Sequence, residues 1–385
     1  MPTANTVAPY DRPMDVNVVM TVLHPQPIKG LGNILLLNAT TSSTSGTGSA
    51  GSGGSTPTTL PDELSNQDRL NGLLLRKTDT NTGAIYREYK NLNAVAVDYP
   101  EDSAVYKKAS AYFAQKMHSD RIAILNYDPA KAYDSLKAFW YFNWTFGVCV
   151  DNTIDDSIVK LSNIFEVNKD HFLVLQTDDL AKYTPMSGQN YTIGLKHNLS
   201  EAMDAAFIGA IALDDIGSVT WKFKQLEGIT ADNLTTQELS GINNVHAIAY
   251  EEMMGKGQTS EGTTLSGEYI DLLHGVMWVQ TTIQGDLQRL LQENGKIPYE
   301  SRGIAMINST IRQVLNRAYD KGIIMTDDTT GRGMFSVNTT PRSQQSRDDL
   351  SNRHYAGASF EYHASSAIHT ITVNGVVDSD TIMAA

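Results

Sequence analysis

The end of the chain places the strongest constraint on what this sequence can form. Residues 355–385 are YAGASFEYHASSAIHTITVNGVVDSDTIMAA, with two β-rich runs, Ala358–Ala364 and Ala367–Val377, around a Ser365–Ser366 turn. Side chains of the second run alternate between two faces with the two-residue period of a strand. Nothing after this run can cover its edge, and an uncovered edge strand is an aggregation hazard in a monomer. The pattern therefore predicts a C-terminal hairpin whose last strand pairs with another subunit. The residues expected to form this inter-subunit arm are Ile368, Thr370, Ile371, Thr372 and Val373.

The N-terminal region has a similar pattern. Met14–Leu23 is MDVNVVMTVL, and it stops before Pro25 and Pro27, which cannot donate to a strand ladder. An N-terminal arm that pairs with a neighbouring subunit is therefore expected as well. The alternative is that both terminal segments close a sheet within their own subunit. The residues expected to pair from the N-terminal arm are Val16, Val18, Met20 and Val22.

Composition limits the classes of partner. The chain has 385 residues, 41% of them hydrophobic and 19% charged, which is enough for two or three hydrophobic cores. Its 30 Lys and Arg against 43 Asp and Glu give a net charge of −13, and no run of basic residues exceeds two, so no nucleic-acid partner is expected. No apolar run approaches the roughly 20 residues that span a bilayer, so no membrane partner is expected.

Helices and strands alternate from about residue 99, a rhythm that is typical of a mostly parallel sheet. Two amphipathic helices, Glu268–Gln292 and Arg302–Lys321, are the clearest elements, and a short strand is expected at Val219–Lys224. The predicted fold is α/β (α+β), with a mixed-sheet core and extended N- and C-terminal β-arms. We expect an N-terminal arm (1–27), a small β region (28–98) with a flexible Gly/Ser insert (39–60), a first α/β subdomain (99–198), a second α/β subdomain (199–338), and a linker, C-terminal hairpin and arm (339–385).

Few residues suggest chemistry. Gly46–Gly51 matches the dinucleotide-binding pattern G-x-G-x-x-G, but it lacks the strand and helix that such a site requires. The nine histidines show no pair at helical spacing, and His363 with His369, on the predicted hairpin, lacks a third metal ligand. Doubled Asp residues fall at expected helix starts, where they stabilise the helix dipole, and Cys149 is expected to be an inert buried thiol. No catalytic, cofactor-binding or metal-binding residue is predicted, and the protein is not expected to be an enzyme.

Four segments, taken in order, resemble the tail-sheath-like proteins of contractile-tailed bacteriophages. The Gly/Ser insert and the glycines of Met254–Gly262 depart from that resemblance. The segments are YPEDSAVY (99–106) with AYFAQ (111–115), VTWKFKQLEGIT (219–230), DLLHGVMWVQ (271–280) with KIPY (296–299), and AIHTITVNGV (367–376).

The resemblance implies a sheath-protein core and a structural role in a phage tail. Sheath subunits form hexameric rings that stack around a tail tube and contract to drive the tube through the host envelope for genome delivery. The implied partners are other copies of the chain, the tail tube protein, and the baseplate and tail terminator proteins. The implied location is the virion, after assembly in the host cytoplasm. The alternatives are another virion component, such as a fibre or adhesin, and an enzyme with an unrecognised α/β site.

The insert Thr40–Thr59 gives a first test. A Gly/Ser-rich loop cannot bury its polar backbone, so we expect it to lie on the surface and to be dispensable for folding. Replacing it with a short turn should leave soluble yield and the thermal midpoint unchanged, and should leave assembly intact in electron micrographs. Loss of soluble protein would contradict this expectation.

Overall fold

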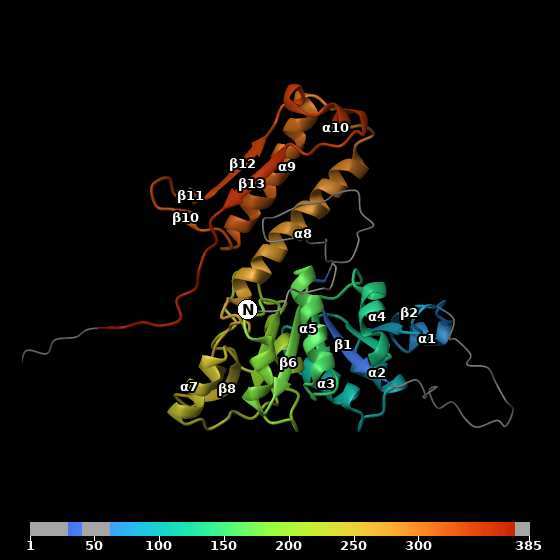
Figure 1. Ribbon diagram of the computed structural model, residues 1–385, viewed down its shortest axis with the longest axis vertical. Helices are drawn as coiled ribbons and strands as arrows, with labels where there is room; N and C mark the ends of the chain where they lie inside the picture. Colours follow the sequence, from blue (N-terminus) through green and yellow to red (C-terminus); the bar gives the residue numbers. More distant parts are fainter. Residues whose placement is uncertain (1–29, 41–61, 374–385) are drawn as a thin grey trace, which may run out of the picture.

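The computed structural model describes residues 30–40 and 62–373. Figure 1 shows a lower body built on one large sheet and an upper body in which two long helices carry short strands. Helix α8 (Ile270–Glu293) starts in the lower body and rises into the upper one. The predicted N-terminal arm, with Val16, Val18, Met20 and Val22, lies outside the described residues.

A nine-stranded mixed sheet forms the lower body, in the order β2-β3-β4-β1-β5-β6-β7-β8-β9. The run from β4 to β8 is parallel, while β2, β3 and β9 pair antiparallel at the two ends. The predicted mixed α/β fold class is thereby confirmed. The strands are β1 (Ile34–Ala39), β2 (Leu73–Thr78), β3 (Ile85–Tyr89), β4 (Ile122–Tyr127), β5 (Phe146–Cys149), β6 (Phe172–Thr177), β7 (Thr192–Lys196), β8 (Ile248–Met253) and β9 (Lys256–Thr259).

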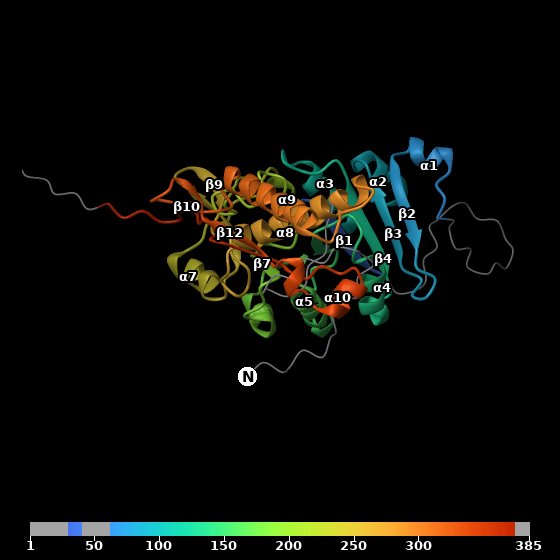
Figure 2. The ribbon, with the colours of Figure 1, turned by 90° about the horizontal axis from the view of Figure 1, so that it is seen from above.

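Helices cover both faces of this sheet. Helices α3 and α6 pack together on one face, and α4 and α5 lie on the other (Figure 2). Asp155 caps α5 by accepting hydrogen bonds from the backbone N–H groups of Ser157 and Ile158, so this doubled Asp marks a helix start as predicted. The helices are α1 (Asn66–Leu70), α2 (Leu92–Asp98), α3 (Ala104–Phe113), α4 (Ala132–Phe139), α5 (Asp156–Asn168), α6 (Met203–Ile211) and α7 (Thr236–Asn244), with 3-10 turns η1 (Pro129–Lys131) and η2 (Leu180–Met186).

Strand β1 changes the predicted division of the chain. The small β region 28–98 and the two α/β subdomains were expected to be separate, but β1 lies at the centre of the large sheet, between β4 and β5. Its apolar run Ile34–Leu37 is almost completely buried, and a strand of this kind needs partners on both sides and helices on both faces. The described residues before α8, 30–40 and 62–269, therefore contribute to a body built on one sheet, and a second body begins near residue 270.

The upper body is a helix pair with two small sheets. Helix α9 (Ser301–Asp320) packs on α8, and both helices agree with their predicted ranges to within two residues. A second core lies between them and includes Ile283, Val314 and Leu315. No helix in the described ranges, including α8 and α9, is long and apolar enough to cross a membrane. The remaining elements are β10 (Thr326–Asp327), β11 (Arg332–Gly333), β12 (Phe335–Thr339), η3 (Arg342–Gln344), α10 (Arg347–Ser351) and β13 (Ala358–Tyr362).

The predicted C-terminal hairpin is wrong in its pairing. Ala358–Ala364 was expected to pair with Ala367–Val377, but β13 pairs with β12, in a register that sets Phe360 opposite Val337. Both strands alternate apolar and polar residues, so this pairing gives the sheet one apolar face, which packs on α9. The described residues after Ser365, 366–373, form no strand.

The base of α8 is fixed in the lower body by a buried histidine. His274 donates a hydrogen bond from Nε2 to the Leu31 carbonyl, at 2.7 Å, and packs edge-on against Phe146. Burial lowers the pKa of His274 to about 4, although the bond to the Leu31 carbonyl acts in the opposite direction. The imidazole is therefore neutral in the folded protein at pH 7.

This neutral histidine predicts a pH dependence of stability. An unfolded histidine has a pKa of about 6.5, so the stabilising contribution is fully present above that pH and is lost as pH falls towards the folded value. At pH 5 the loss should be about 2 kcal/mol in the free energy of unfolding. His274→Gln keeps a donor near Nε2 but does not titrate, so it should lose less stability between pH 7 and pH 5. Denaturant unfolding at both pH values would measure this, and equal losses would contradict it.

Candidate assembly interface

The β12–β13 sheet presents one face to the molecule and one to solvent. Phe335 and Val337 on β12, with Phe360 and Tyr362 on β13, face α9. A two-stranded sheet alone is marginally stable, so this apolar contact is what holds it. The opposite face is exposed and polar, and consists of Ser336, Asn338, Ser359 and Glu361.

The outer edges of these two strands differ. Thr340 N–H donates to the Gly357 carbonyl at 2.8 Å, and such hydrogen-bonded pairs alternate along an antiparallel ladder. The backbone groups of Val337 and Phe360 therefore point away from the partner strand. On the β12 side, the Arg312 guanidinium donates to the Val337 carbonyl at 3.2 Å. On the other side, β13 has no second strand partner among the described residues.

A hollow of about 390 Å³ lies beside the β12 edge, between this strand and α9. Arg312 and Thr339 line it, and small side chains four residues apart on α9 form its floor. The edge of β12 is thus bordered by a groove that Arg312 partly occupies. The small side chains are Ser301, Ala305 and Ser309.

The predicted C-terminal arm residues leave the upper body as an exposed segment. Residues 366–373 run away from β13 along the outside of the molecule, as Figure 1 shows, and form no strand. Ile368, Ile371 and Val373 are 79%, 81% and 84% exposed, and Thr370 and Thr372 are exposed as well. Three large apolar side chains on one unpaired segment are unusual for a surface without a partner. Pairing with another subunit remains a prediction.

His369 is the exception in this segment, because it is partly buried. Its Nε2 lies 2.7 Å from the Thr220 hydroxyl and its Nδ1 lies 3.3 Å from a Glu261 carboxylate oxygen. Its ring meets the edge of Tyr269 at a centroid distance of 5.0 Å. His363 lies elsewhere, on the end of β13, so the two histidines do not meet as the hairpin would require. No sequence signal identified this contact.

The loop between α6 and α7, residues 212–235, reaches this contact. Val219–Lys224 was predicted to be a strand, but it forms none. Trp221 turns into the core against Phe207, and Phe223 takes a left-handed φ of 66°, so its ring lies outside. Burial of Trp221 prevents the regular alternation of side chains that a strand at Val219–Lys224 would need.

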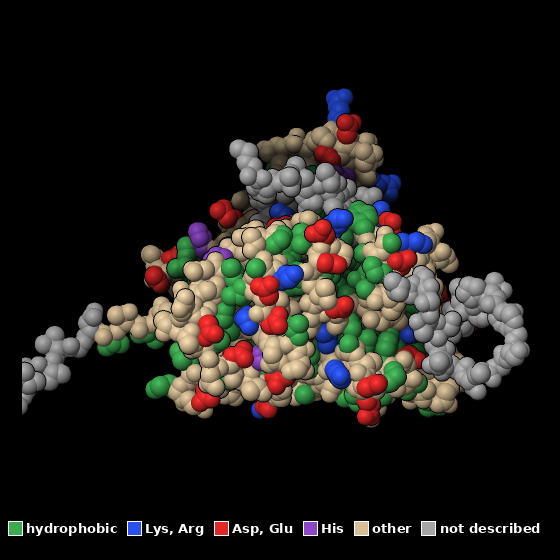
Figure 3. All heavy atoms as spheres, turned by 60° about the horizontal axis from the view of Figure 1, so that its bottom comes forward, with side chains coloured by type: hydrophobic (Ala, Val, Ile, Leu, Met, Phe, Trp, Pro, Cys, Tyr) green, Lys and Arg blue, Asp and Glu red, His purple; other side chains and the backbone are tan. Residues whose placement is uncertain are grey.

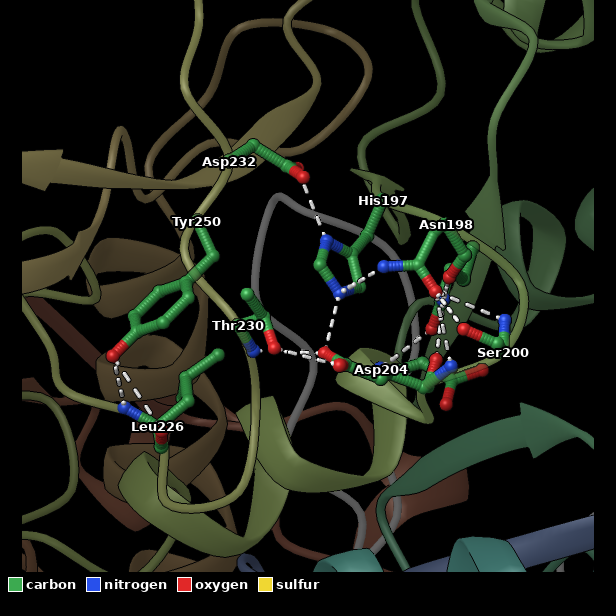
Figure 4. Close-up of polar contacts among 10 residues, drawn as sticks. His197, Asn198, Ser200, Asp204, Leu226, Thr230, Asp232 and Tyr250 are labelled. Atoms are coloured by element: carbon green, nitrogen blue, oxygen red, sulfur yellow. Dashed lines mark hydrogen bonds and ion pairs between the residues drawn. The ribbon is translucent and has the colours of Figure 1, made fainter.

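A polar cluster around His197 secures the far end of this loop (Figure 4). The buried His197 ring contacts Asp232 through Nδ1 and Glu201 through Nε2, both at 3.0 Å. Glu201 also accepts hydrogen bonds from the Thr230 N–H and hydroxyl, each at 2.8 Å. Burial would raise the pKa of Glu201, but these bonds hold it below its usual value. The cluster therefore ties residues 230–232 to the sheet.

This cluster has histidine–carboxylate contacts like those of some active sites, but its geometry is structural. Both His197 nitrogens are occupied and the ring is inaccessible to solvent. The nearby Ser200 hydroxyl is bonded to Asn198, not to His197. Cys149 is buried, as predicted, and burial raises the pKa of its thiol to about 12. Within the described ranges, no three His, Cys, Asp or Glu residues are grouped to hold a metal ion.

Charge is distributed unevenly between the two bodies. Residues 270–373 carry ten Lys or Arg and ten Asp or Glu, so the whole net charge of −13 lies outside this range. On the face shown in Figure 3, basic and acidic side chains are interspersed, without a basic patch. This face offers no stripe of positive charge for a nucleic-acid backbone.

The C-terminal part matches a known family. Residues 270–374 match the family model "E217 tail sheath protein gp31-like, C-terminal domain". This C-terminal part of the chain is therefore similar to the C-terminal domain of a tail sheath protein. The match begins at the first residue of α8, where the structure also divides the chain, and it includes the β12–β13 sheet and the exposed segment. No curated protein shows significant sequence similarity.

Solved structures support the same fold over nearly the whole chain. A protein of the anti-feeding prophage (AFP) baseplate, solved with 6-fold symmetry, has a TM-score of 0.65 at 11% identity and covers 97% of this chain and 99% of its own. The PVC sheath of an extracellular contractile injection system, in the contracted state, has a TM-score of 0.62 at 9% identity, with the same coverage. The AFP helical sheath in the contracted state has a TM-score of 0.58 at 10% identity, covering 96% and 99%. These structures share the fold of this chain, in agreement with the resemblance of its sequence segments to tail sheath proteins.

The His197 cluster gives a test that separates the two bodies. His197→Ala removes charge-assisted hydrogen bonds to two carboxylates and should cost roughly 3 kcal/mol in the free energy of unfolding. Backbone amides of residues 226–232 should exchange faster, while those of α9, which lie in the other core, should not change. Hydrogen exchange followed by mass spectrometry would show this. Equal acceleration in α9 would contradict a local role.

Proposed function

We propose that this protein is a structural subunit of a contractile sheath. The observation that carries the proposal is that a tail sheath C-terminal domain matches residues 270–374 of a chain whose full length has the fold of contractile sheath proteins. The role is mechanical: the subunit polymerises, and the polymer shortens. The described residues supply a compact body for packing and an exposed segment for linking one body to the next.

The arrangement proposed for the assembly is a stack of hexameric rings around a rigid tail tube, in a phage tail or a related particle. Two relatives come from sheaths in the contracted state and one from a 6-fold baseplate, and these assemblies support the proposal by analogy. Contacts with a tube protein, a baseplate and a terminator belong to the same proposal, as does assembly in the host cytoplasm before incorporation into the particle. Copies of the chain itself are the primary partners.

Strand addition would link these copies. In the proposal, the C-terminal arm, Ile368–Val373, pairs with the outer edge of β13 in a neighbour, because that edge is open while Arg312 occupies a carbonyl on the β12 edge. The N-terminal arm, Val16–Val22, would add beside it from another neighbour. Backbone hydrogen bonds of this kind persist while rigid bodies rotate, provided that the chain at the root of each arm can bend.

The proposal requires no enzyme chemistry. The energy of contraction would be stored when subunits are packed in an extended, metastable polymer and released as they repack. The relatives are structural sheath proteins, and the histidine–carboxylate contacts in this chain serve to hold loops.

Proline substitutions in the arm test the proposal. Thr370→Pro or Thr372→Pro deletes a backbone donor and fixes φ near −65°, at a cost of roughly 3 kcal/mol or more where the N–H is bonded. Both residues are exposed and outside any strand in the single subunit. The variants should therefore keep the thermal midpoint of the monomer but fail to form tubes in electron micrographs.

Ser359→Pro is the matched control. Ser359 is also exposed, but it lies opposite Asn338 inside the β12–β13 ladder, so its proline variant should destabilise the monomer itself. Tubes of normal length from the Thr370→Pro and Thr372→Pro proteins would overturn the arm proposal. Absence of tubes from the wild-type protein would overturn the sheath proposal.

A further inference from the structure

Among residues 366–373, His369 is the one residue that is partly buried. Before this stretch, Ser365 N–H donates to the Ile323 carbonyl of the upper body. His369 contacts the lower body through Thr220, Glu261 and Tyr269. The side chains on both sides of His369 are exposed. A single partly buried histidine therefore interrupts a segment that is otherwise open to solvent.

The receptor for His369 is built by distant parts of the lower body. Thr220 comes from the α6–α7 loop, Glu261 follows β9, and Tyr269 is the residue before α8. Lys222 forms an ion pair with Glu261, which keeps this carboxylate beside the loop. The Phe223 ring also faces His369, at a centroid distance of 6.1 Å.

The backbone at Phe223 is unusual in a way that serves this receptor. Its φ of 66° lies in the left-handed region, where a bulky residue is strained. Phe223 N–H donates to the Thr259 carbonyl at 3.0 Å, which holds the strained turn in place. The turn sends Trp221 into the core and the Phe223 ring outwards, so strain is maintained where His369 docks.

The same loop also adjoins the root of the N-terminal segment. Trp221, next to Thr220, packs on His274 at a ring distance of 6.0 Å, and His274 holds the Leu31 carbonyl. The described part of the chain begins at residue 30, next to Leu31. Leu31 and His369 therefore both make contacts near the start of α8, through His274 and Tyr269 respectively.

We propose that His369 is a positioning residue that fixes where, and in which direction, the C-terminal arm leaves its own subunit. We call His369, Thr220, Glu261 and Tyr269 the His369 clamp. This inference rests on the proposed function, because it assigns a role to one residue of the proposed arm. Within the arm Ile368–Val373, the His369 side chain stays on its own subunit and fixes the position from which the other residues of the arm, chiefly Thr370–Val373, reach the neighbour.

The clamp shortens the free part of the arm. Without it, the segment would be free from Ser365 onwards; with it, the free part begins at Thr370. Each residue of extended chain spans at most about 3.3–3.6 Å. The clamp therefore shortens the distance that the arm can reach from its last fixed point, and it restricts the directions in which the arm can point. Ordering a segment before it binds reduces the entropy lost on strand addition. The clamp also transmits force from the arm to the base of α8, the helix that joins the two bodies.

Distance measurements on the monomer test the clamp without requiring tubes. The Met254→Cys/Val373→Cys protein would carry spin labels at the exposed tip of the β8–β9 hairpin and at an exposed arm residue, while the buried Cys149 stays unlabelled. Pulsed electron spin resonance should give one narrow distance distribution in this parent. His369→Ala should broaden the distribution at least twofold.

Three further variants make the test specific. His369→Gln, whose amide can bond to both Thr220 and Glu261, should keep the distribution narrow. Thr220→Val, on the body side of the clamp, should broaden it as His369→Ala does. Thr370→Ala, at an exposed neighbouring position, should leave it unchanged.

The clamp would be overturned if the distance distribution in the His369→Ala protein were as narrow as in the parent. It would also be overturned if Thr370→Ala broadened the distribution as much as His369→Ala does. Tube formation by the wild-type protein is a separate measurement. If wild-type tubes do not form, the sheath proposal fails even if the clamp is observed. If wild-type tubes form but the distance distribution of His369→Ala is as narrow as that of the parent, only the clamp fails. When the sheath proposal and the clamp both hold, the His369→Ala protein should also form tubes more slowly than wild type.

Discussion

One helix contributes to both hydrophobic cores of this protein. Ile270 and Met277 of α8 are buried in the core of the large sheet, and Val279 and Ile283 belong to the core of the upper body. The transition occurs within a single turn, so the two bodies are joined by continuous, hydrogen-bonded helix instead of by a loop. His274, within this helix, is bonded to Leu31 and surrounded by aromatic rings. The position of the β12–β13 sheet relative to the large sheet depends on this buried segment.

This construction suits a subunit that has to move as a unit. A helix rooted in one core and packed in another transmits rotation with little bending, because interiors are close-packed. The proposed connections between subunits would then be the arms, and the described part of the C-terminal arm contacts its own body through His369. Strand pairing is well matched to that role, since it depends on backbone groups and tolerates changes in orientation. In the proposed assembly, the open edge of β13 and the exposed apolar residues after it would be the two halves of such a contact.

Polar clusters that resemble catalytic groups have another explanation in this fold. The lower body has a long loop, residues 212–235, without regular structure, and such loops need fixed points. His197 with its two carboxylates fixes one end, and Trp221 fixes the other by burial. Both nitrogens of the buried His197 have partners, and an unpaired one would be costly. The loop is consequently firm enough to present Thr220 and Phe223 to His369.

The sequence alone determined the elements that depend on local patterns. The apolar stripes of α8 and α9 follow the 3,4 spacing of a helix, and Asp155 was identifiable as a helix start because capping is a short-range interaction. The alternation of helices and strands indicated the mixed α/β class, and four segments identified the tail-sheath resemblance.

Only the tertiary structure decided which strands became partners. β13 pairs with β12 because both present apolar residues to α9, a face that neither strand reveals by itself. β1 lies at the centre of the sheet because its buried run needs neighbours that occur about 90 residues later or more. The stretch around Trp221 has a strand-like pattern, yet burial of one indole bends it into a loop. His369 meets Thr220 and Glu261 across more than 100 residues of sequence. Strand partners and such contacts are chosen by the shape and chemistry of distant surfaces, which come together only when the chain folds.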